Sequence, residues 1–101
     1  MAKGYLMVRA VLADANDRPA FEHWYVTEHM PQAIEAFGAL RGWRYWNRTD
    51  PDVHFAFYEF ASVAEADALV SSSALAGMVA EFNRVWGSRV SRTREILEQA
   101  P

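Results

Sequence analysis

An acid and a base stand side by side just before a helix-breaking residue. The stretch "FEHWYVTEHMPQAI" covers residues 21–34 and has helical spacing, with Glu28 next to His29 and Pro31 two positions later. On a regular helix Glu28 falls on the aromatic stripe that should face a sheet. A carboxylate buried there has a raised pKa, and an imidazole beside it titrates near neutrality. General acid–base catalysis uses such groups, so Glu28 and His29 are the candidate catalytic residues.

Pro31 should distort the helix at the turn that carries this pair. It lacks the N–H group that would bond to the carbonyl of Thr27, and its ring crowds that carbonyl, at a cost of about 3 kcal/mol in a helix interior. We expect a kink that opens a gap between helix and sheet, and such a gap is a candidate substrate pocket. The candidate substrate-binding residues are the aromatic side chains of this helix and of the sheet: Trp24, Tyr25, Trp43, Tyr45 and Phe57.

A purely structural interpretation of the same residues stays open. Pro31 would then begin a second helix after a bend, and His29 would bond to a backbone carbonyl. Glu28 would pair with an arginine of a predicted strand, because perturbed charges also occur in structural ion-pair networks. The available arginines are Arg9, Arg44, Arg92 and Arg94.

Other polar residues give weaker signals. His23 falls on the opposite side of the helix and should be exposed, and His54 begins a strand beside a turn, at a pocket mouth or in solvent. The three histidines have no metal-ligand spacing, so we expect no metal. Without a glycine-rich phosphate loop, we expect no cofactor either. Most strand arginines should be solvated, although one facing a cavity would suit a carboxylate or phenolate ligand.

The spacing of apolar residues predicts the elements that must position this site. Residues 4–13 read as a strand whose even positions are all apolar, so that one face is buried. A helix over 17–37 follows, with Asp17 as N-cap and Gly38 just past its end. The remaining expected elements are strands at 40–48 and 53–61 joined by the turn 49–52, helices at 62–71 and 75–86, and a last strand at 88–97.

This order, β-α-β-β-α-β, is the ferredoxin-like order. We therefore expect an α+β fold in which residues 1–101 form one domain, with one antiparallel four-stranded sheet and the helices on one of its faces. The other face needs a cover. A homodimer that presses sheet against sheet would supply it.

Composition limits the classes of function. The 101 residues are 51% hydrophobic and include 4 Trp, 4 Tyr and 6 Phe, more aromatic area than one small core needs. The net charge of −3 weighs against a nucleic-acid partner. No stretch is long enough to span a bilayer, so no membrane partner is expected. The absence of cysteine suits a cytoplasmic protein.

Taken together, three segments resemble the EthD-like branch of the dimeric α+β barrel proteins. They are "FEHWYVTEHMPQAIEAFG", "LRGWRYW" and "FNRVWGSRVSRTREIL". Members commonly have an aromatic pair followed by a histidine and, two residues later, a proline, as in Trp24-Tyr25 and His29-Met30-Pro31 here. The resemblance implies a homodimer, a barrel built from two sheets, and a cavity for a small apolar or aromatic ligand in each subunit. Related barrels include muconolactone isomerases, aromatic polyketide cyclases and cofactor-free monooxygenases. Haem-degrading members use an asparagine–tryptophan–histidine set that has no clear counterpart here.

Two hypotheses of different classes follow. In the first, the chain is a cofactor-independent enzyme, an isomerase, cyclase or cofactor-free monooxygenase, that acts on a small aromatic, lactone or polyketide-like molecule. His29 moves a proton and Glu28 assists it. In the second, the chain is a non-catalytic barrel that binds a small ligand or serves in a stress response.

Overall fold

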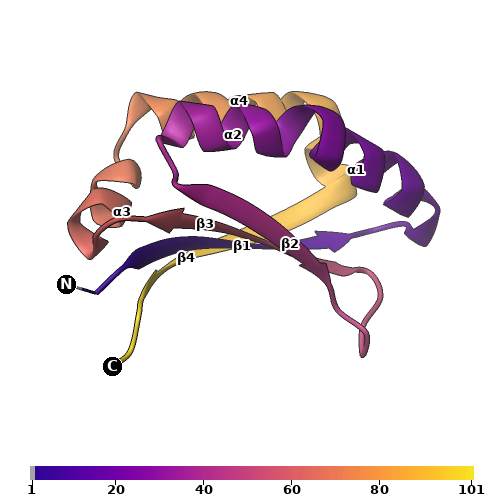
Figure 1. The fold of residues 1–101 in the computed structure, drawn as a ribbon. Helices are drawn as coiled ribbons and strands as arrows, with labels where there is room; N and C mark the ends of the chain where they lie inside the picture. The colour runs from indigo at the N-terminus through magenta and orange to yellow at the C-terminus, as the bar shows by residue number, and fades with distance from the viewer. Residues whose placement is uncertain (1) are drawn as a thin grey trace.

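A computed structural model describes residues 2–101 and shows one antiparallel sheet with all helices on one of its faces (Figure 1). The strand order is β2-β3-β1-β4. The expected α+β fold with the ferredoxin-like order and a four-stranded antiparallel sheet is therefore confirmed. The strands are β1 Gly4–Leu12, β2 Arg41–Trp46, β3 Val53–Phe60 and β4 Val90–Glu98.

The helical layer contains four α-helices and three shorter helical turns within residues 2–101. The α-helices are α1 Arg18–Trp24, α2 Met30–Phe37, α3 Val63–Leu69 and α4 Ser73–Trp86. The shorter turns are the 3₁₀ segments η1 Ala15–Asp17 and η3 Gly87–Arg89 and the π-helical segment η2 Tyr25–His29. Serine side chains cap α3 and α4, since Ser62 accepts a hydrogen bond from the N–H of Glu65 and Ser72 from that of Leu75.

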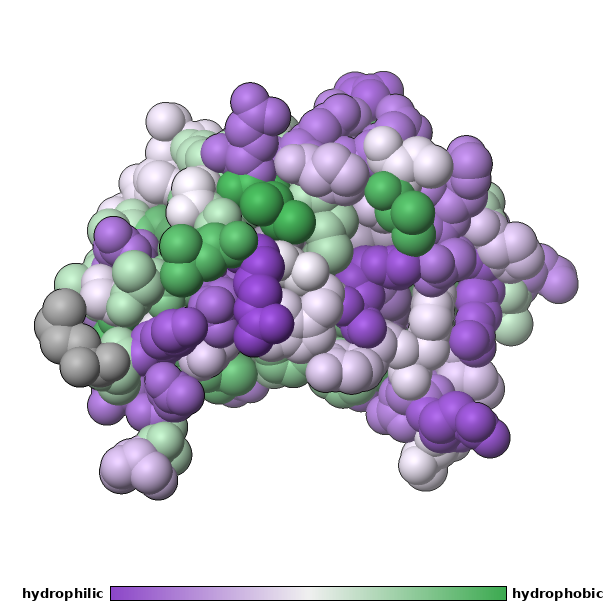
Figure 2. Space-filling view, viewed as in Figure 1, coloured by the Kyte–Doolittle hydropathy of each residue, from purple (hydrophilic) through white to green (hydrophobic). Residues whose placement is uncertain are grey.

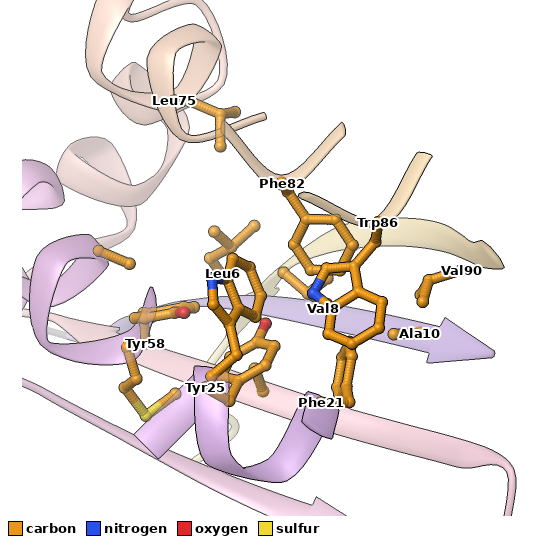
Figure 3. Close-up of a cluster of buried hydrophobic side chains, with 14 of the residues drawn as sticks. Leu6, Val8, Ala10, Phe21, Tyr25, Tyr58, Leu75, Phe82, Trp86 and Val90 are labelled. Carbon is orange, nitrogen blue, oxygen red and sulfur yellow. The ribbon is translucent and has the colours of Figure 1, made fainter. Parts of the chain in front are cut away.

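The central strand β1 separates a buried face from an open one, as its alternation predicts. Its even positions from Gly4 to Leu12 are all buried, whereas Arg9 on the other face is exposed. Figure 3 shows side chains from the helices converging on the buried face, with Phe82 and Trp86 coming from α4 and Tyr25 from η2. This core between helices and sheet is dominated by aromatic rings.

Within residues 2–101, the opposite face of the sheet carries no helix (Figure 1). The sheet arches, and Figure 2 shows the molecule hollowed beneath it, between the C-terminal end and the β2–β3 turn. The last strand, β4, lies at one edge of the sheet beside β1. Its register places Ile96 opposite Leu6, a core position of β1. The last strand expected from the sequence, at 88–97, is thus formed over nine residues, Val90–Glu98.

The helix that contains Pro31 is not broken. It runs through Tyr25–His29 as a π-helical turn, in which the N–H of Met30 donates to the carbonyl of Tyr25, five residues earlier. The hydroxyl of Thr27 also donates to the carbonyl of His23, at 2.7 Å. The wider turn avoids the need for an N–H group at Pro31, and α1 and α2 stay continuous through it. The structure therefore has a π-bulge at this point where the sequence predicts a kink and a gap.

No single helix in residues 2–101 has the length and apolar character needed to cross a membrane. Only the pair Val63–Leu69 and Ser73–Arg89, bent by 55° at its break, reaches that length and composition when taken together. Leu75, Phe82 and Trp86 of this pair are buried in the core against the sheet.

Two glycines give a matched test of the packing. A Cβ atom at Gly4 would lie 2.7 Å from the carbonyl oxygen of Ser62 and 2.8 Å from the Cα of Val63, whereas one at Gly77 would meet nothing within 4 Å. We expect Gly4→Ala to lower the free energy of unfolding by about 1–3 kcal/mol, because backbone must move. Gly77→Ala, inside α4, should raise it by about 0.5–1 kcal/mol. Urea denaturation checks both, and a neutral Gly4→Ala would contradict the close approach of α3 to β1.

Candidate functional site

The π-bulge decides which of the two candidate catalytic residues faces the interior. The additional residue in this turn shifts the helix phase by about 100° relative to a regular helix. As a result His29 is buried, at 6% exposure, and Glu28 is exposed. The expected burial of Glu28 on the aromatic stripe is wrong, because the expectation assumed an uninterrupted period of 3.6 residues.

The imidazole of His29 lies inside the aromatic core. It stacks on the indole of Trp24 with ring centroids 4.4 Å apart and an interplanar angle of 18°, and the rings of Tyr25 and Phe82 meet it edge-on. Its Nδ1 atom is buried without a hydrogen-bond partner among residues 2–101. Burial, with a smaller effect from the charge of Arg92, lowers the pKa of His29 to about 4. The expected titration near neutrality is therefore wrong, and the ring is neutral at pH 7.

A small cavity adjoins this ring. Its volume open to a water-sized sphere is about 20 Å³, which is room for one water molecule. Tyr25, Tyr58 and His29 supply its polar groups, and the hydroxyl of Tyr58 has no hydrogen-bond partner in the described chain. Burial raises the pKa of Tyr25 to about 12 and that of Tyr58 well above its usual value, so both phenols keep their protons. The apolar walls are Leu6, Val8, Phe37, Leu75, Met78 and Val79.

Two arginines of β4, Arg92 and Arg94, complete the lining of this cavity and also line a wider cleft. The cleft has a volume of about 290 Å³ and lies between α4 and β4, with Val79, Asn83 and Val90 as its other walls. The cleft and the cavity share Val79 and both arginines. A ligand in the cleft would therefore contact residues that also line the cavity beside His29.

A second polar cluster joins α1 to β2 and β3, and the ring of Tyr25 lies between it and His29. Arg44 donates two hydrogen bonds to the carboxylate of Glu22, at 2.7 and 2.9 Å, and the indole N–H of Trp46 donates a third at 2.8 Å. The Nη1 atom of Arg44 also lies 3.2 Å from Nε2 of His54. The hydrogen bonds from Arg44, the largest cause, lower the pKa of Glu22 to about 2.

Sequence patterns do not reveal this cluster. Arg44 is one of the possible partners of Glu28 by sequence, but it pairs with Glu22, six residues closer to the start of the helix. His54 was expected at a pocket mouth or in solvent, yet it is completely buried on the core face of β3, opposite Ala10. Burial and the charge of Arg44 lower its pKa to about 3. The available signal was the i,i+2 spacing of Arg44 and Trp46, which places both on one face of β2. His23 is exposed, as expected.

The five candidate substrate-binding residues lie on two opposite faces of the sheet. Trp24 and Tyr25 are in the core beside His29. The other three lie on the face without helices, where the ring of Phe57 stacks on that of Trp43 at 5.7 Å and meets that of Tyr45 edge-on at 5.8 Å. One chain therefore does not bring the five into a common pocket, because alternate residues of β2 and β3 point to opposite faces.

No protein-family model and no curated protein sequence matches the chain. Solved structures do match it along nearly its whole length. SnoaB, a cofactor-independent oxygenase from Streptomyces nogalater, is 7% identical with a TM-score of 0.65, covering 100% of this chain and 96% of that one. HapK from Hahella chejuensis is 19% identical with a TM-score of 0.68, covering 96% and 92%. An EthD family protein from Bacillus halodurans is 12% identical with a TM-score of 0.66, covering 95% and 99%.

These similarities establish a shared fold. An EthD family protein is among the matching structures, which agrees with the resemblance noted from the Trp24-Tyr25 and His29-Met30-Pro31 motif. At this level of identity the similarity establishes the arrangement of helices and sheet only. The chemistry must be inferred from the residues of this chain.

The two buried histidines should make stability depend on pH. Their pKa values are about 4 and 3 in the folded protein, against 6.5 when unfolded, so the unfolded chain binds more protons as the pH falls below 6.5. The free energy of unfolding should then decrease with falling pH, by up to about 1.4 kcal/mol per pH unit for each histidine.

Replacing one histidine isolates its contribution to the pH dependence of the free energy of unfolding. We expect His29→Phe, which keeps an aromatic ring against Trp24, to reduce the slope of this free energy against pH between pH 6 and pH 5. Above pH 7.5 both histidines are neutral in both states, so there the substitution should leave the pH slope unchanged. Urea denaturation at a series of pH values measures the slopes. Equal slopes between pH 6 and pH 5 would show that His29 is not held neutral by the fold.

Proposed function

We propose that the chain is a cofactor-independent enzyme that acts on a small aromatic, lactone or polyketide-like molecule and uses His29 to move a proton. The observation that carries this proposal is a neutral imidazole with a buried, unpartnered Nδ1 atom at the wall of a cavity. A buried polar atom without a partner costs free energy, and active sites are where such atoms occur. Trp24 and Tyr25 hold the ring and would contact the ligand.

The proposed proton transfer gains from the charge beside His29. At pH 7 the ring is unprotonated and can accept a proton from a substrate carbon or hydroxyl. The charge of Arg92 helps to keep its pKa low. A negative ligand group next to Arg92 would offset that charge, so the basicity of His29 would rise once the substrate is bound. Glu28 is exposed and has no part in this step.

The filled interior favours a second candidate, a barrel that binds a small ligand without catalysis. The cavity beside His29 has room for one water, so an organic molecule must lie mainly in the cleft lined by Arg92 and Arg94. A carrier would need only this cleft. Turnover of any substrate separates the two candidates.

We also propose that the chain forms a homodimer through the sheet face that carries no helix. That face presents the rings of Tyr5, Trp43, Tyr45 and Phe57, and Tyr45 is 56% exposed. Contiguous aromatic surface of this kind is usually covered by another protein surface. Pressing two such faces together would bury it and close a barrel.

Charge placed on the bare face should break the dimer. We expect the unsubstituted protein to have twice the mass of one chain at about 10 µM in light scattering, and Tyr45→Glu to have the mass of one chain, because a carboxylate buried between apolar faces is unfavourable. Val26→Glu is the matched control, since Val26 is 52% exposed on the helical side. A monomer before substitution, or a dimer that survives Tyr45→Glu, would contradict this interface.

Catalysis can be tested with a panel of naphthols, hydroxylated lactones and anthraquinol-type compounds. Changes in absorbance and oxygen uptake report turnover of each compound. With any compound that is turned over, we expect His29→Phe to lower kcat by about 10²–10⁴-fold, the usual contribution of a positioned proton-transfer group. Glu28→Gln is the matched control and should stay within about threefold of the unsubstituted protein, because Glu28 is exposed and does not line the cavity. Circular dichroism and light scattering confirm that the variants are folded and assembled. A folded His29→Phe protein with unchanged kcat would refute the role of His29.

A further inference from the structure

Two arginines stand where a strand should present apolar side chains. In the β1–β4 register, Val90, Arg92, Arg94 and Ile96 pair with Leu12, Ala10, Val8 and Leu6. Directly paired residues of antiparallel strands project from the same face. The four β1 partners are all buried in the core, so Arg92 and Arg94 belong to the helix-covered side of the sheet rather than to its bare side.

We infer that Arg92 and Arg94 form a binding site for the carboxylate of a small aromatic acid, whose ring extends toward His29. This inference rests on the proposed function, because it names the class of ligand that the same site would take. A planar guanidinium group matches the geometry of a carboxylate and donates to it through two N–H groups.

The Arg92 side chain is held in place with most of its donors free. Its Nη2 atom donates to Oδ1 of Asn83 at 2.7 Å, and its guanidinium carbon lies 3.7 Å from the centre of the Phe82 ring. A guanidinium group has five N–H donors, and within residues 2–101 this is the one hydrogen bond that Arg92 donates. The group is thus fixed by the protein while its other donors remain available for a ligand.

Neither arginine forms an ion pair within the described part of the chain. The carboxylates that pair with arginine or lysine in residues 2–101 do so elsewhere, as Glu22 with Arg44 and Glu59 with Arg41. Burial, together with the charge of Arg94, lowers the pKa of Arg92. Arg92 is partly buried beside the like charge of the exposed Arg94, and neither has a counter-charge. A bound anion would offset both the burial of Arg92 and the repulsion between the two arginines.

The spaces around the arginines fit an aromatic acid. The cleft of about 290 Å³ is lined by Arg92, Arg94 and Asn83, and it shares Val79 with the cavity of His29 and Tyr25. A second, more apolar pocket of about 210 Å³ adjoins Arg94 and is lined by Leu6, Val70, Leu75, Glu95 and Ile96. Cationic and apolar walls therefore meet at Arg94, which is the arrangement that recognises a molecule with one charged end and one apolar end.

The simpler interpretation is that these arginines only keep the edge strand soluble. That role is served by charged side chains that face solvent along the free edge. Arg92 instead lies against Phe82 of α4 and lines the cavity of His29. Its place beneath the helix is what favours a ligand over a solvated edge.

The test compares 2-naphthoate with its uncharged isostere 2-naphthamide in calorimetric titrations of the full chain. We expect the acid to bind at least tenfold more tightly in 50 mM salt, with the difference shrinking at 500 mM salt, because the attraction is screened. Arg92→Gln combined with Arg94→Gln should abolish the preference. Arg48→Gln, at an exposed residue after β2, removes the same charge elsewhere and should preserve it.

Three outcomes would overturn the inference. They are equal binding of acid and amide, unchanged acid preference in the double variant, and competition by inorganic phosphate as strong as that by benzoate. Circular dichroism of the double variant confirms that loss of binding is not loss of folding, and Arg92→Lys, which keeps the charge, should retain part of the preference. The titration measures binding and no turnover, so failure of the proposed catalysis would leave this result standing.

Discussion

The missing N–H group of Pro31 is the constraint on which the arrangement of the interior depends. Pro31 has no N–H group to donate to the carbonyl four residues earlier, and its ring crowds that carbonyl in a regular α-helix. The structure avoids this clash with a π-helical turn at Tyr25–His29. The added residue shifts the phase of the helix. His29 then enters the core and Glu28 leaves it. A single backbone defect thus selects the imidazole over the carboxylate as the group beside the cavity.

The core treats its polar groups in two different ways. On one side of Tyr25, Glu22, Arg44, Trp46 and His54 form a hydrogen-bonded cluster that joins α1 to the sheet, although Nδ1 of His54 has no partner within residues 2–101. On its other side, His29, Tyr58 and Arg92 keep unused hydrogen-bonding capacity around the cavity and cleft. The first arrangement is that of a structural support. The second retains unfavourable groups that a ligand could satisfy, which is how binding sites differ from packed cores.

The aromatic residues also divide into two sets with separate tasks. The rings of Phe21, Trp24, Tyr25, Phe82 and Trp86 fill the space between helices and sheet (Figure 3). Those of Tyr5, Trp43, Tyr45 and Phe57 lie on the bare face of the arched sheet (Figure 1). The large aromatic content is therefore explained by one core and one uncovered surface. Sequence composition alone reveals the excess without showing where it goes.

Local patterns in the sequence determined the elements and their order. The alternation of β1 and the apolar spacing of α4 each depend on residues within one strand or one helix, so they could be read directly. Even the need for a helix defect followed from Pro31. The tertiary structure decided the form of that defect, since a kink and a π-bulge relieve the same clash and differ in what they bury. It also decided which strand residues meet the helix, placing Arg44 with Glu22 and Arg92 beside Phe82. Such pairings join segments far apart in the chain, and no local spacing encodes them.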